Sequence, residues 1–376
     1  MKSLGLYIHI PFCRKKCLYC DFCSFPCRDA ETHARYAERV RRDLSQYAEA
    51  CADHTVDTVY FGGGTPTLLA PAQLTGILDR VRQDYRLAPD AEITLECNPA
   101  TVSEADLRAL RTGGFNRISI GLQSSHENEL RALGRIHTYA DFSTTFAAAR
   151  AAGFANISVD LMSGIPEQTA QSWVETIERV AALGPEHISA YGLIVEAGTP
   201  FFERADSLAL PDEETARRMY FDGIHALAAH GYAQYEISNF AKAGYESRHN
   251  LKYWNCDEYL GFGPSAYSDY GGDRFGNSRD LDAYLSGEPI EWERETPSRE
   301  ARMSEYVMLR MRLCEGVIAR DFEQRFGVSF AARYADRLAP YAQMGLLSTR
   351  RDATAFTAEG FYVSNAILSE ILDFSE

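Results

Sequence analysis

Short apolar runs alternate with longer stretches of helical periodicity through the first half of the chain. The runs are rich in β-branched and aromatic residues and lie at 4–10, 56–61, 91–97, 116–121, 156–161 and 187–193. Between them, apolar positions recur at helical spacing over 31–50, 71–85, 103–112, 140–152 and 169–183. Strands that alternate with helices predict βαβ units and a parallel sheet. Several strands are apolar throughout, which indicates a sheet covered by helices.

The pattern changes in the second half. A helix is predicted at 212–230 and a short strand near 232–237, and helices are predicted again at 298–315 and 320–326. Residues 345–363 predict a small hairpin and a turn. We therefore expect an α/β part over 1–240 and a smaller helical, winged-helix-like domain over 290–376. The segment between them, 241–289, is rich in Gly, Asn, Asp and aromatic residues, and we expect it to be an irregular connection.

Composition narrows the class of protein. The 376 residues are 45% hydrophobic and 24% charged, as in a globular chain with a real core. The net charge of −15 predicts poor binding to nucleic acid or to anionic membranes. No stretch is long enough to span a bilayer, and the N-terminus lacks a secretory pattern. We expect a cytoplasmic protein that is not an integral membrane protein.

The cysteines point to a metal site. Nine are present, and five fall at Cys13, Cys17, Cys20, Cys23 and Cys27. In a reducing compartment such clustering favours metal binding or catalysis over disulfides. The first three form CxxxCxxC directly after the first strand, and three thiolates can hold three irons of a [4Fe–4S] cubane. The fourth iron then stays open for S-adenosylmethionine (SAM). The alternative is a structural zinc ion, with Cys23 or Cys27 as its fourth ligand.

Glycine-rich and polar signals follow several strands at their carboxyl ends, where α/β folds bind ligands. The sequence FGGGTPT at 61–67 lets backbone approach a ligand closely, and beside the cysteines it fits the amino-acid end of SAM. A tight structural turn is the alternative, whereas a phosphate loop would need a lysine and a helix start. Glu96 and Asp160 are expected to accept hydrogen bonds from the SAM amine or ribose, and Arg135 to pair with its carboxylate. Taken alone, each of these residues is more often a cap or a surface group than a ligand.

The segment RHNLKYWNCDEYLGFGPSAYS at 248–268 brings His249 close to Tyr253 and Trp254. Histidine is a common axial ligand of heme iron, and the two aromatic rings offer apolar surface for a porphyrin. The alternative is a packing cluster under a loop, in which His249 is hydrogen-bonded to the backbone.

Several motifs occur in the order of one known family: CxxxCxxC with Tyr19, GGGTP, ECNP at 96–99, ISIGLQS at 118–124, LGRIHT at 133–138 and VDLMSGIP at 159–166. The chain resembles the coproporphyrinogen III oxidase-like branch of radical SAM proteins, and within it the heme chaperones. The resemblance implies a partial (β/α)6 barrel with an added C-terminal domain. It implies that Cys13, Cys17 and Cys20 bind the cluster. It also implies SAM contacts from Tyr7, Tyr19, Gly63, Gly64, Thr65, Glu96, Gln123, Arg135, Asp160 and Ile194.

Two departures separate the chain from the oxidase itself. The oxidase has a fourth cysteine two residues after the third, where this chain has Phe22, with Cys23 one residue later. The oxidase also has a long segment before its first strand, whereas here that strand begins close to Met1. The resemblance therefore implies a heme chaperone, which binds heme near His249 and transfers it to a respiratory hemoprotein, with a homodimer as one expected state. The alternatives are oxygen-independent coproporphyrinogen III oxidase and a radical SAM heme methyltransferase. The sequence does not indicate the electron donor.

Overall fold

The structure, a computed structural model, describes residues 2–26 and 29–372. Six parallel strands lie side by side in chain order and form the centre of a twelve-stranded sheet. They are β1 (Lys2–Ile10), β4 (His54–Gly63), β5 (Leu87–Cys97), β6 (Arg117–Gln123), β7 (Ile157–Ser163) and β8 (His187–Gly192). The predicted α/β fold with a partial (β/α)6 barrel is confirmed.

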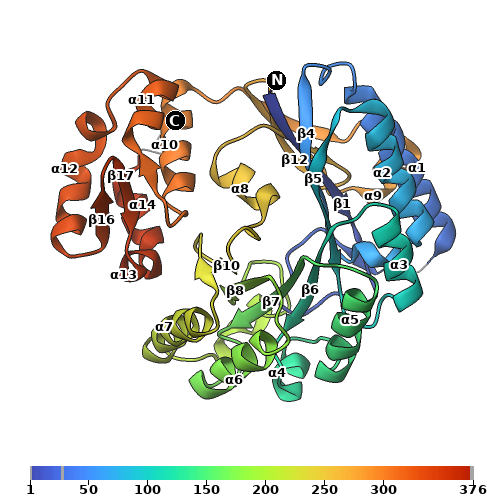
Figure 1. Cartoon of the computed structure of the whole chain (residues 1–376), viewed down its shortest axis with the longest axis horizontal. Coiled ribbons are helices and arrows are strands. Elements are labelled where there is room, and N and C mark those ends of the chain that lie inside the picture. Colours follow the sequence, from blue (N-terminus) through green and yellow to red (C-terminus); the bar gives the residue numbers. More distant parts are fainter. Residues whose placement is uncertain (1, 27–28, 373–376) are drawn as a thin grey trace.

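Helices cover the convex side of this sheet (Figure 1). They are α1 (Ala30–Tyr47), α2 (Pro71–Asp84), α3 (Glu104–Thr112), α5 (Tyr139–Ala151), α6 (Ala170–Ala181) and α7 (Glu213–Ala229). Helix α6 shows how the sequence sets this packing, because Trp173, Ile177 and Val180 recur at helical spacing and are all buried. Thr169 ends the preceding loop by accepting a hydrogen bond from the backbone N–H of Ser172, which caps the helix.

Short elements occupy the loops at the carboxyl ends of the strands. They are β2 (Phe12–Cys13), β3 (Phe25–Pro26), η1 (Pro66–Leu68), α4 (Glu127–Ala132) and η2 (Phe202–Ser207). After α7, strands β9 (Ala233–Gln234) and β10 (Asn239–Ala241) extend the sheet beyond β8 in antiparallel pairing.

The segment 241–289 differs from the irregular connection that its composition predicts. It contains α8 (Arg248–Trp254), β11 (Tyr259–Phe262), β12 (Tyr267–Tyr270), β13 (Asp273–Asn277) and α9 (Leu281–Ser286). Strand β11 pairs in parallel with β1, with Gly5 opposite Tyr259 and Ile8 opposite Phe262. Strands β12, β13 and β14 (Glu291–Glu295) continue the sheet in antiparallel pairing. Helix α8 lies on the concave side of the sheet (Figure 1).

The C-terminal part has a hydrophobic core of its own. Its helices are α10 (Arg299–Arg310), α11 (Ala319–Phe326), α12 (Phe330–Gln343), α13 (Ala358–Tyr362) and α14 (Ser364–Ile371). Strands β15 (Val317–Ile318), β17 (Ala353–Phe356) and β16 (Leu347–Arg350) form a small antiparallel sheet, in that order. Helices with a small antiparallel hairpin agree with the predicted winged-helix-like character.

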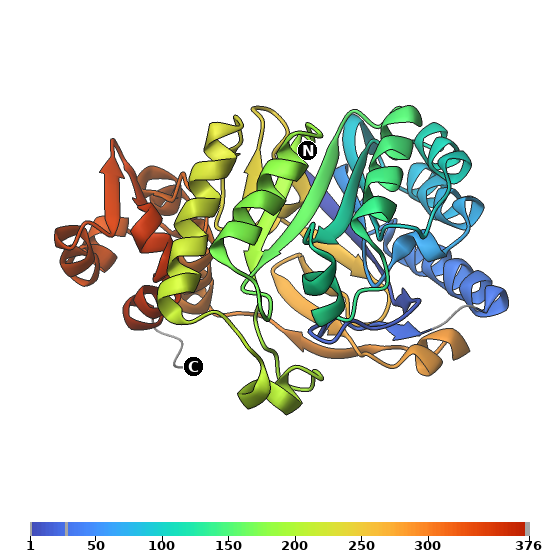
Figure 2. The ribbon, with the colours of Figure 1, turned by 90° about the horizontal axis from the view of Figure 1, so that it is seen from below.

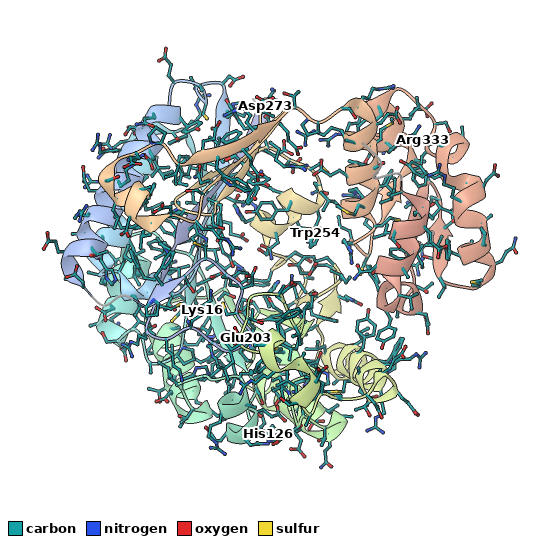
Figure 3. The ribbon with its side chains drawn as sticks, turned by 180° about the vertical axis from the view of Figure 1, so that it is seen from behind. Lys16, His126, Glu203, Trp254, Asp273 and Arg333 are labelled. Carbon is teal, nitrogen blue, oxygen red and sulfur yellow. The ribbon has the colours of Figure 1, made fainter. Side chains whose placement is uncertain are left out.

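The C-terminal part packs against the barrel through α13 and α7 (Figure 2) and through α10 and α8. Figure 3 shows Trp254, the last residue of α8, between the sheet and these C-terminal helices. Among the described residues, no helix is both long and apolar enough to cross a membrane.

Candidate functional site

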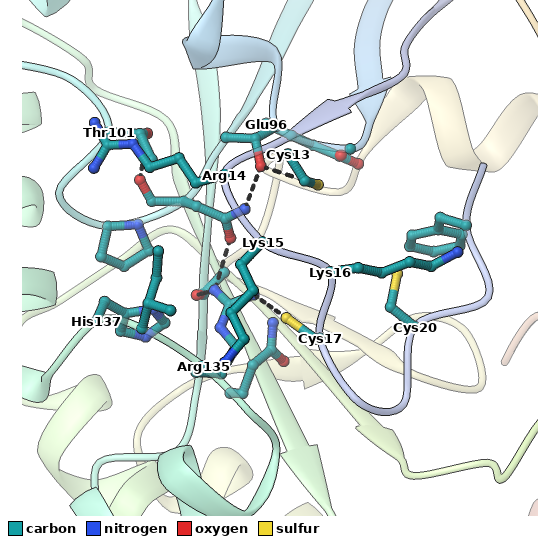
Figure 4. Close-up of a pocket in the computed structure, with 18 of the residues that line it drawn as sticks. Cys13, Arg14, Lys15, Lys16, Cys17, Cys20, Glu96, Thr101, Arg135 and His137 are labelled. Carbon is teal, nitrogen blue, oxygen red and sulfur yellow. Dashed lines mark hydrogen bonds between the residues drawn. The ribbon is translucent and has the colours of Figure 1, made fainter. Parts of the chain in front are cut away.

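A pocket opens at the carboxyl ends of the barrel strands (Figure 4). It encloses about 1020 Å³ of space that protein atoms do not fill, counted to its open mouth. Most of the residues that the sequence predicts for the site line it together: Cys13, Cys17, Tyr19, Cys20, Gly63, Gly64, Thr65, Glu96, Gln123, Arg135 and Asp160. These residues come from the loops and ends of five different strands, so the predicted convergence at this edge of the sheet is present.

The glycine loop lies directly against the cysteine loop. The backbone N–H of Gly64 donates to the carbonyl of Ile10 at 2.8 Å, and that of Thr65 donates to the carbonyl of Phe12 at 2.7 Å. The Thr65 hydroxyl lies 3.5 Å from Sγ of Cys13. A Cβ atom added at Gly64 would lie 2.5 Å from the Phe12 carbonyl oxygen, so no larger residue fits there without moving the backbone.

The three cysteines of CxxxCxxC line the same pocket. Burial raises the pKa of the Cys20 thiol to about 11, and the neighbouring Cys17 and Cys13 add to the rise. Arg135 Nη1 lies 3.6 Å from Cys17 Sγ, in position to donate to it. Among the described residues, no three Cys, His, Asp or Glu side chains meet closely enough to hold one metal ion.

Two of the five N-terminal cysteines, Cys23 and Cys27, lie outside CxxxCxxC. Cys23 is buried, and its thiol is 3.8 Å from the carbonyl oxygen of Arg279, to which it donates. Phe22, two residues after Cys20, is 67% exposed. Cys27 lies outside the described residues.

The carboxyl groups of two partly buried residues, Glu96 and Asp160, line the pocket. Burial raises the pKa of Glu96 to about 7, and the nearby charge of Asp160 adds to the rise. Tyr60 donates to Oε1 of Glu96 at 2.8 Å, and the backbone N–H of Gly63 donates to Oε2 at 3.0 Å. Burial also raises the pKa of Asp160, although the Ser119 hydroxyl donates to it at 2.9 Å. Two neighbouring carboxyl groups, one of which raises the proton affinity of the other, favour a cationic ligand.

Arg135 is fixed beside this pair. Its Nη2 donates to Oδ1 of Asn98 at 2.7 Å and to the carbonyl of Gly121 at 2.5 Å. Its Nε is buried and has no hydrogen-bond partner among the described residues. A buried, unpartnered N–H is costly, so this group is suited to an anionic or carbonyl partner that a ligand would supply.

Asn98 and Tyr191 line the pocket, although the sequence did not single out either of them. Asn98 follows Glu96 in the ECNP motif, and its amide joins Thr65 to Arg135. Tyr191 lies in β8, and its hydroxyl donates to Oε1 of Gln123 at 2.9 Å. Gln123 itself has a positive φ of 76°, which is uncommon for a residue other than glycine. Asn98 belongs to the ECNP motif, which could have indicated it, whereas no local sequence pattern indicates Tyr191 as a pocket residue.

Three predicted residues do not line this pocket: Tyr7, Ile194 and His249. Ile194 is 68% exposed. Tyr7 is partly buried inside the barrel, where its ring stacks on Tyr60 and on His249.

His249 is deeply buried and fully engaged. It is 1% exposed, its Nδ1 lies 2.8 Å from the Thr58 hydroxyl, and its Nε2 lies 2.8 Å from the Tyr253 hydroxyl. Burial lowers the pKa of the imidazole to about 3, so the ring is neutral at ordinary pH. Both ring nitrogens are therefore used inside the fold, and an axial bond to heme iron requires one of these hydrogen bonds to break.

The pocket residues fit a cluster and SAM. The thiols of CxxxCxxC provide the sulfur donors that iron–sulfur clusters take. The paired carboxyl groups suit the cationic amine and sulfonium of SAM, and the unpartnered Nε of Arg135 suits its carboxylate. The fold and this donor set define the class: the chain is a radical SAM protein, and residues 7–180 match the model of the radical SAM superfamily. Within that class it belongs to the HemW family.

Relatives that match over nearly their whole length support the assignment to the HemW family. The chain is 35% identical to the heme chaperone HemW of Bacillus subtilis (strain 168) over 99% of each chain. It is 33% identical to the heme chaperone HemW of Escherichia coli (strain K12), again over 99% of each. Residues 298–363 match the model of the HemN C-terminal domain. The structure of the radical SAM enzyme coproporphyrinogen III oxidase (HemN) from Escherichia coli superposes with a TM-score of 0.87 at 25% identity, covering all of this chain and 91% of the other.

Proposed function

We propose that this chain is a cytoplasmic heme chaperone that binds heme and transfers it to a respiratory hemoprotein. The observation that carries the proposal is the pocket, in which three cysteines, a glycine loop and two partly buried carboxyl groups converge, in a chain whose full-length relatives are named heme chaperones. The acidic surface, with a net charge of −15, agrees with a protein that does not bind nucleic acid.

In this proposal Cys13, Cys17 and Cys20 hold a [4Fe–4S] cluster. When bound, the cluster and SAM supply one-electron chemistry. The chain's own residues bind and orient: Glu96 and Asp160 accept from the SAM amine and ribose, and Arg135 pairs with the SAM carboxylate. Gly64 lets the glycine loop lie against the backbone of the cysteine loop.

Coproporphyrinogen III oxidase is the second candidate, because the HemN oxidase shares this fold over the whole chain. Against it, Phe22 stands where the oxidase has its fourth cysteine, and the thiol of Cys23 is buried and donates to a backbone carbonyl. We therefore expect no decarboxylation of coproporphyrinogen III by the anaerobically reconstituted chain with SAM and a reductant. Appearance of protoporphyrinogen would favour the oxidase.

The cluster is tested by removing single thiols. We expect Cys13→Ala, Cys17→Ala and Cys20→Ala each to lose most of the iron and sulfide bound per chain after anaerobic reconstitution. Cys314→Ala is the matched control, because Cys314 is an exposed thiol in the C-terminal part. Heme binding is tested by titrating the reconstituted chain with hemin. Full iron content in all three variants would contradict the cluster, and absence of hemin binding would contradict the chaperone.

A further inference from the structure

The loop between Cys13 and Cys17 concentrates positive charge at the pocket mouth. Arg14, Lys15 and Lys16 are consecutive, all exposed, and all line the pocket (Figure 4). Among the described residues none of the three forms an ion pair with an acidic side chain, and Arg14 donates to the carbonyl of Ala100 at 2.9 Å. The chain as a whole has a net charge of −15, so three consecutive basic residues form a patch of opposite sign. Its charges face the mouth of the pocket and are available to an anion.

Large apolar side chains lie on the same mouth. Phe22 is 67% exposed and Ile136 is 58% exposed, and both line the pocket. They come from different loops, one after Cys20 and the other after Arg135. Exposed apolar side chains gathered at one opening mark a binding surface more often than scattered ones do. The mouth therefore combines apolar contact area with unpaired cations.

We propose that this mouth is where the chain holds heme, with the propionates on Arg14, Lys15 and Lys16 and the macrocycle against Phe22 and Ile136. The inference rests on the proposed function, since it concerns where heme is bound. Heme carries two carboxylates on one edge of a flat apolar ring, which matches cations on one loop and apolar side chains beside them. Charge-assisted hydrogen bonds from Arg and Lys to carboxylates are the stronger kind, and the apolar ring gains by leaving water.

The mouth also differs from the His249 segment in access. His249 is 1% exposed and uses both ring nitrogens, so a ligand reaches it after internal hydrogen bonds break. The cations and apolar groups of the mouth are already exposed in the folded chain. Binding there needs no rearrangement of α8, and it places the porphyrin directly over the proposed cluster and SAM.

The first test changes the ligand and leaves the chain unaltered. The anaerobically reconstituted chain is titrated with iron-free protoporphyrin IX and with its dimethyl ester, and fluorescence reports binding. We expect the ester to bind at least about tenfold more weakly, because it lacks the carboxylates that the basic loop holds. Equal affinity for acid and ester would overturn the proposal.

The second test changes the chain. We expect R14Q/K15Q/K16Q to bind the free acid about tenfold more weakly and to bind the ester as the unaltered chain does. F22S/I136S should weaken binding of both ligands. The matched control is R320Q/R350Q/R351Q, which removes three exposed arginines from the C-terminal part. Iron and sulfide content are measured for each variant, so that loss of the cluster is not mistaken for loss of the porphyrin site.

The outcomes separate this inference from the function on which it rests. An equal loss in the control triplet would mean a general effect of net charge and would overturn the mouth as the site. If H249A loses hemin while the mouth variants keep it, heme is held at His249 and the chaperone function stands. If neither hemin nor the iron-free porphyrin binds the unaltered chain, the proposed function itself fails.

Discussion

The hydroxyl of Tyr60 donates a hydrogen bond to Oε1 of Glu96, with an O···O distance of 2.8 Å. The ring of Tyr60 also stacks on His249. The two ring centroids are 5.1 Å apart and the ring planes meet at 26°. One tyrosine thus joins a pocket carboxyl group to helix α8 on the concave side of the sheet. His249 of α8 is thus linked to the pocket residue Glu96 through Tyr60.

Tyr60→Phe should therefore weaken SAM binding. The hydrogen bond from Tyr60 lowers the Glu96 pKa, so its loss raises that pKa above the present value of about 7. A larger fraction of Glu96 is then protonated at neutral pH and cannot accept from the SAM amine. We expect about tenfold weaker SAM binding near neutral pH, since a hydrogen bond to a charged group contributes roughly 1.5–3 kcal/mol. The loss of SAM affinity should be smaller in more alkaline buffer, where Glu96 is deprotonated in both proteins.

Isothermal titration of SAM into the reconstituted protein measures this effect. Tyr85→Phe is the matched control, because Tyr85 donates to the carbonyl of Leu44 at 2.6 Å, outside the pocket. The same SAM affinity in both variants would show that Glu96 does not hold SAM in the way proposed.

Gly64→Ala should destabilise the folded chain and disturb the pocket. The added Cβ would lie 2.5 Å from the Phe12 carbonyl oxygen, and a backbone atom cannot move aside easily. We expect a loss of about 1–3 kcal/mol in the free energy of unfolding, measured in urea. Gly76→Ala is the opposite case: Gly76 lies within α2, its Cβ would meet no atom within 4 Å, and we expect a gain of about 0.5–1 kcal/mol. Similar changes in both variants would contradict the steric argument.

Glu236→Gln should make stability less sensitive to pH. Glu236 is fully buried where β-bridge pairing with Leu313 joins the barrel to the C-terminal part, and burial raises its pKa to about 7. In the unfolded chain the carboxyl titrates near 4.3. Between these values unfolding releases a proton, so the wild-type chain loses stability as pH rises from about 4 to about 7, and the penalty is complete above that.

Glutamine has no charge to bury. We expect Glu236→Gln to match the wild type near pH 4 and to exceed it by roughly 3 kcal/mol near pH 8, from urea unfolding at both values. An offset that is the same at both pH values would rule out ionisation of Glu236 as the cause.

His249→Ala should destabilise the chain without requiring any loss of heme. It removes both hydrogen bonds of the imidazole and leaves a cavity, which costs roughly 2–4 kcal/mol. The folded pKa of about 3 lies below the unfolded value near 6.5, so the wild type loses stability as pH falls below about 6.5. The variant lacks this titration, so its deficit should narrow by about 1.4 kcal/mol per pH unit there. A deficit that widens on acidification would contradict a neutral, buried imidazole.

The sequence predicted the barrel well because its signals are local. Each of the six parallel strands was an apolar run, and each helix between them had an apolar face, as in α6. The pocket could be predicted for the same reason, since Cys13 comes soon after β1, Gly64 directly follows β4 and Glu96 lies at the carboxyl end of β5.

The rest depends on contacts between residues far apart in the chain. Strand β11 is four residues long and is recognised as a strand through its pairing with β1, some 250 positions earlier. Tyr191 lies in β8 and its hydroxyl reaches Gln123 of β6 across the intervening strand β7, a contact that the local sequence pattern does not reveal. His249 had an aromatic neighbourhood compatible with heme or with packing. The structure places its nitrogens on Thr58 and Tyr253, and Thr58 lies in another element altogether.

The pairing of β11 with β1 has a consequence for synthesis. Strand β1 is made first, but the neighbour on its outer side is Tyr259–Phe262, so that edge stays open until most of the polypeptide has left the ribosome. An open, apolar strand edge is a place where nascent chains associate wrongly. Closing it late also demands a long loop closure, which slows folding. The cysteine loop follows β1 at once, so the strand that carries it gains its last neighbour only after Tyr259–Phe262 has been made.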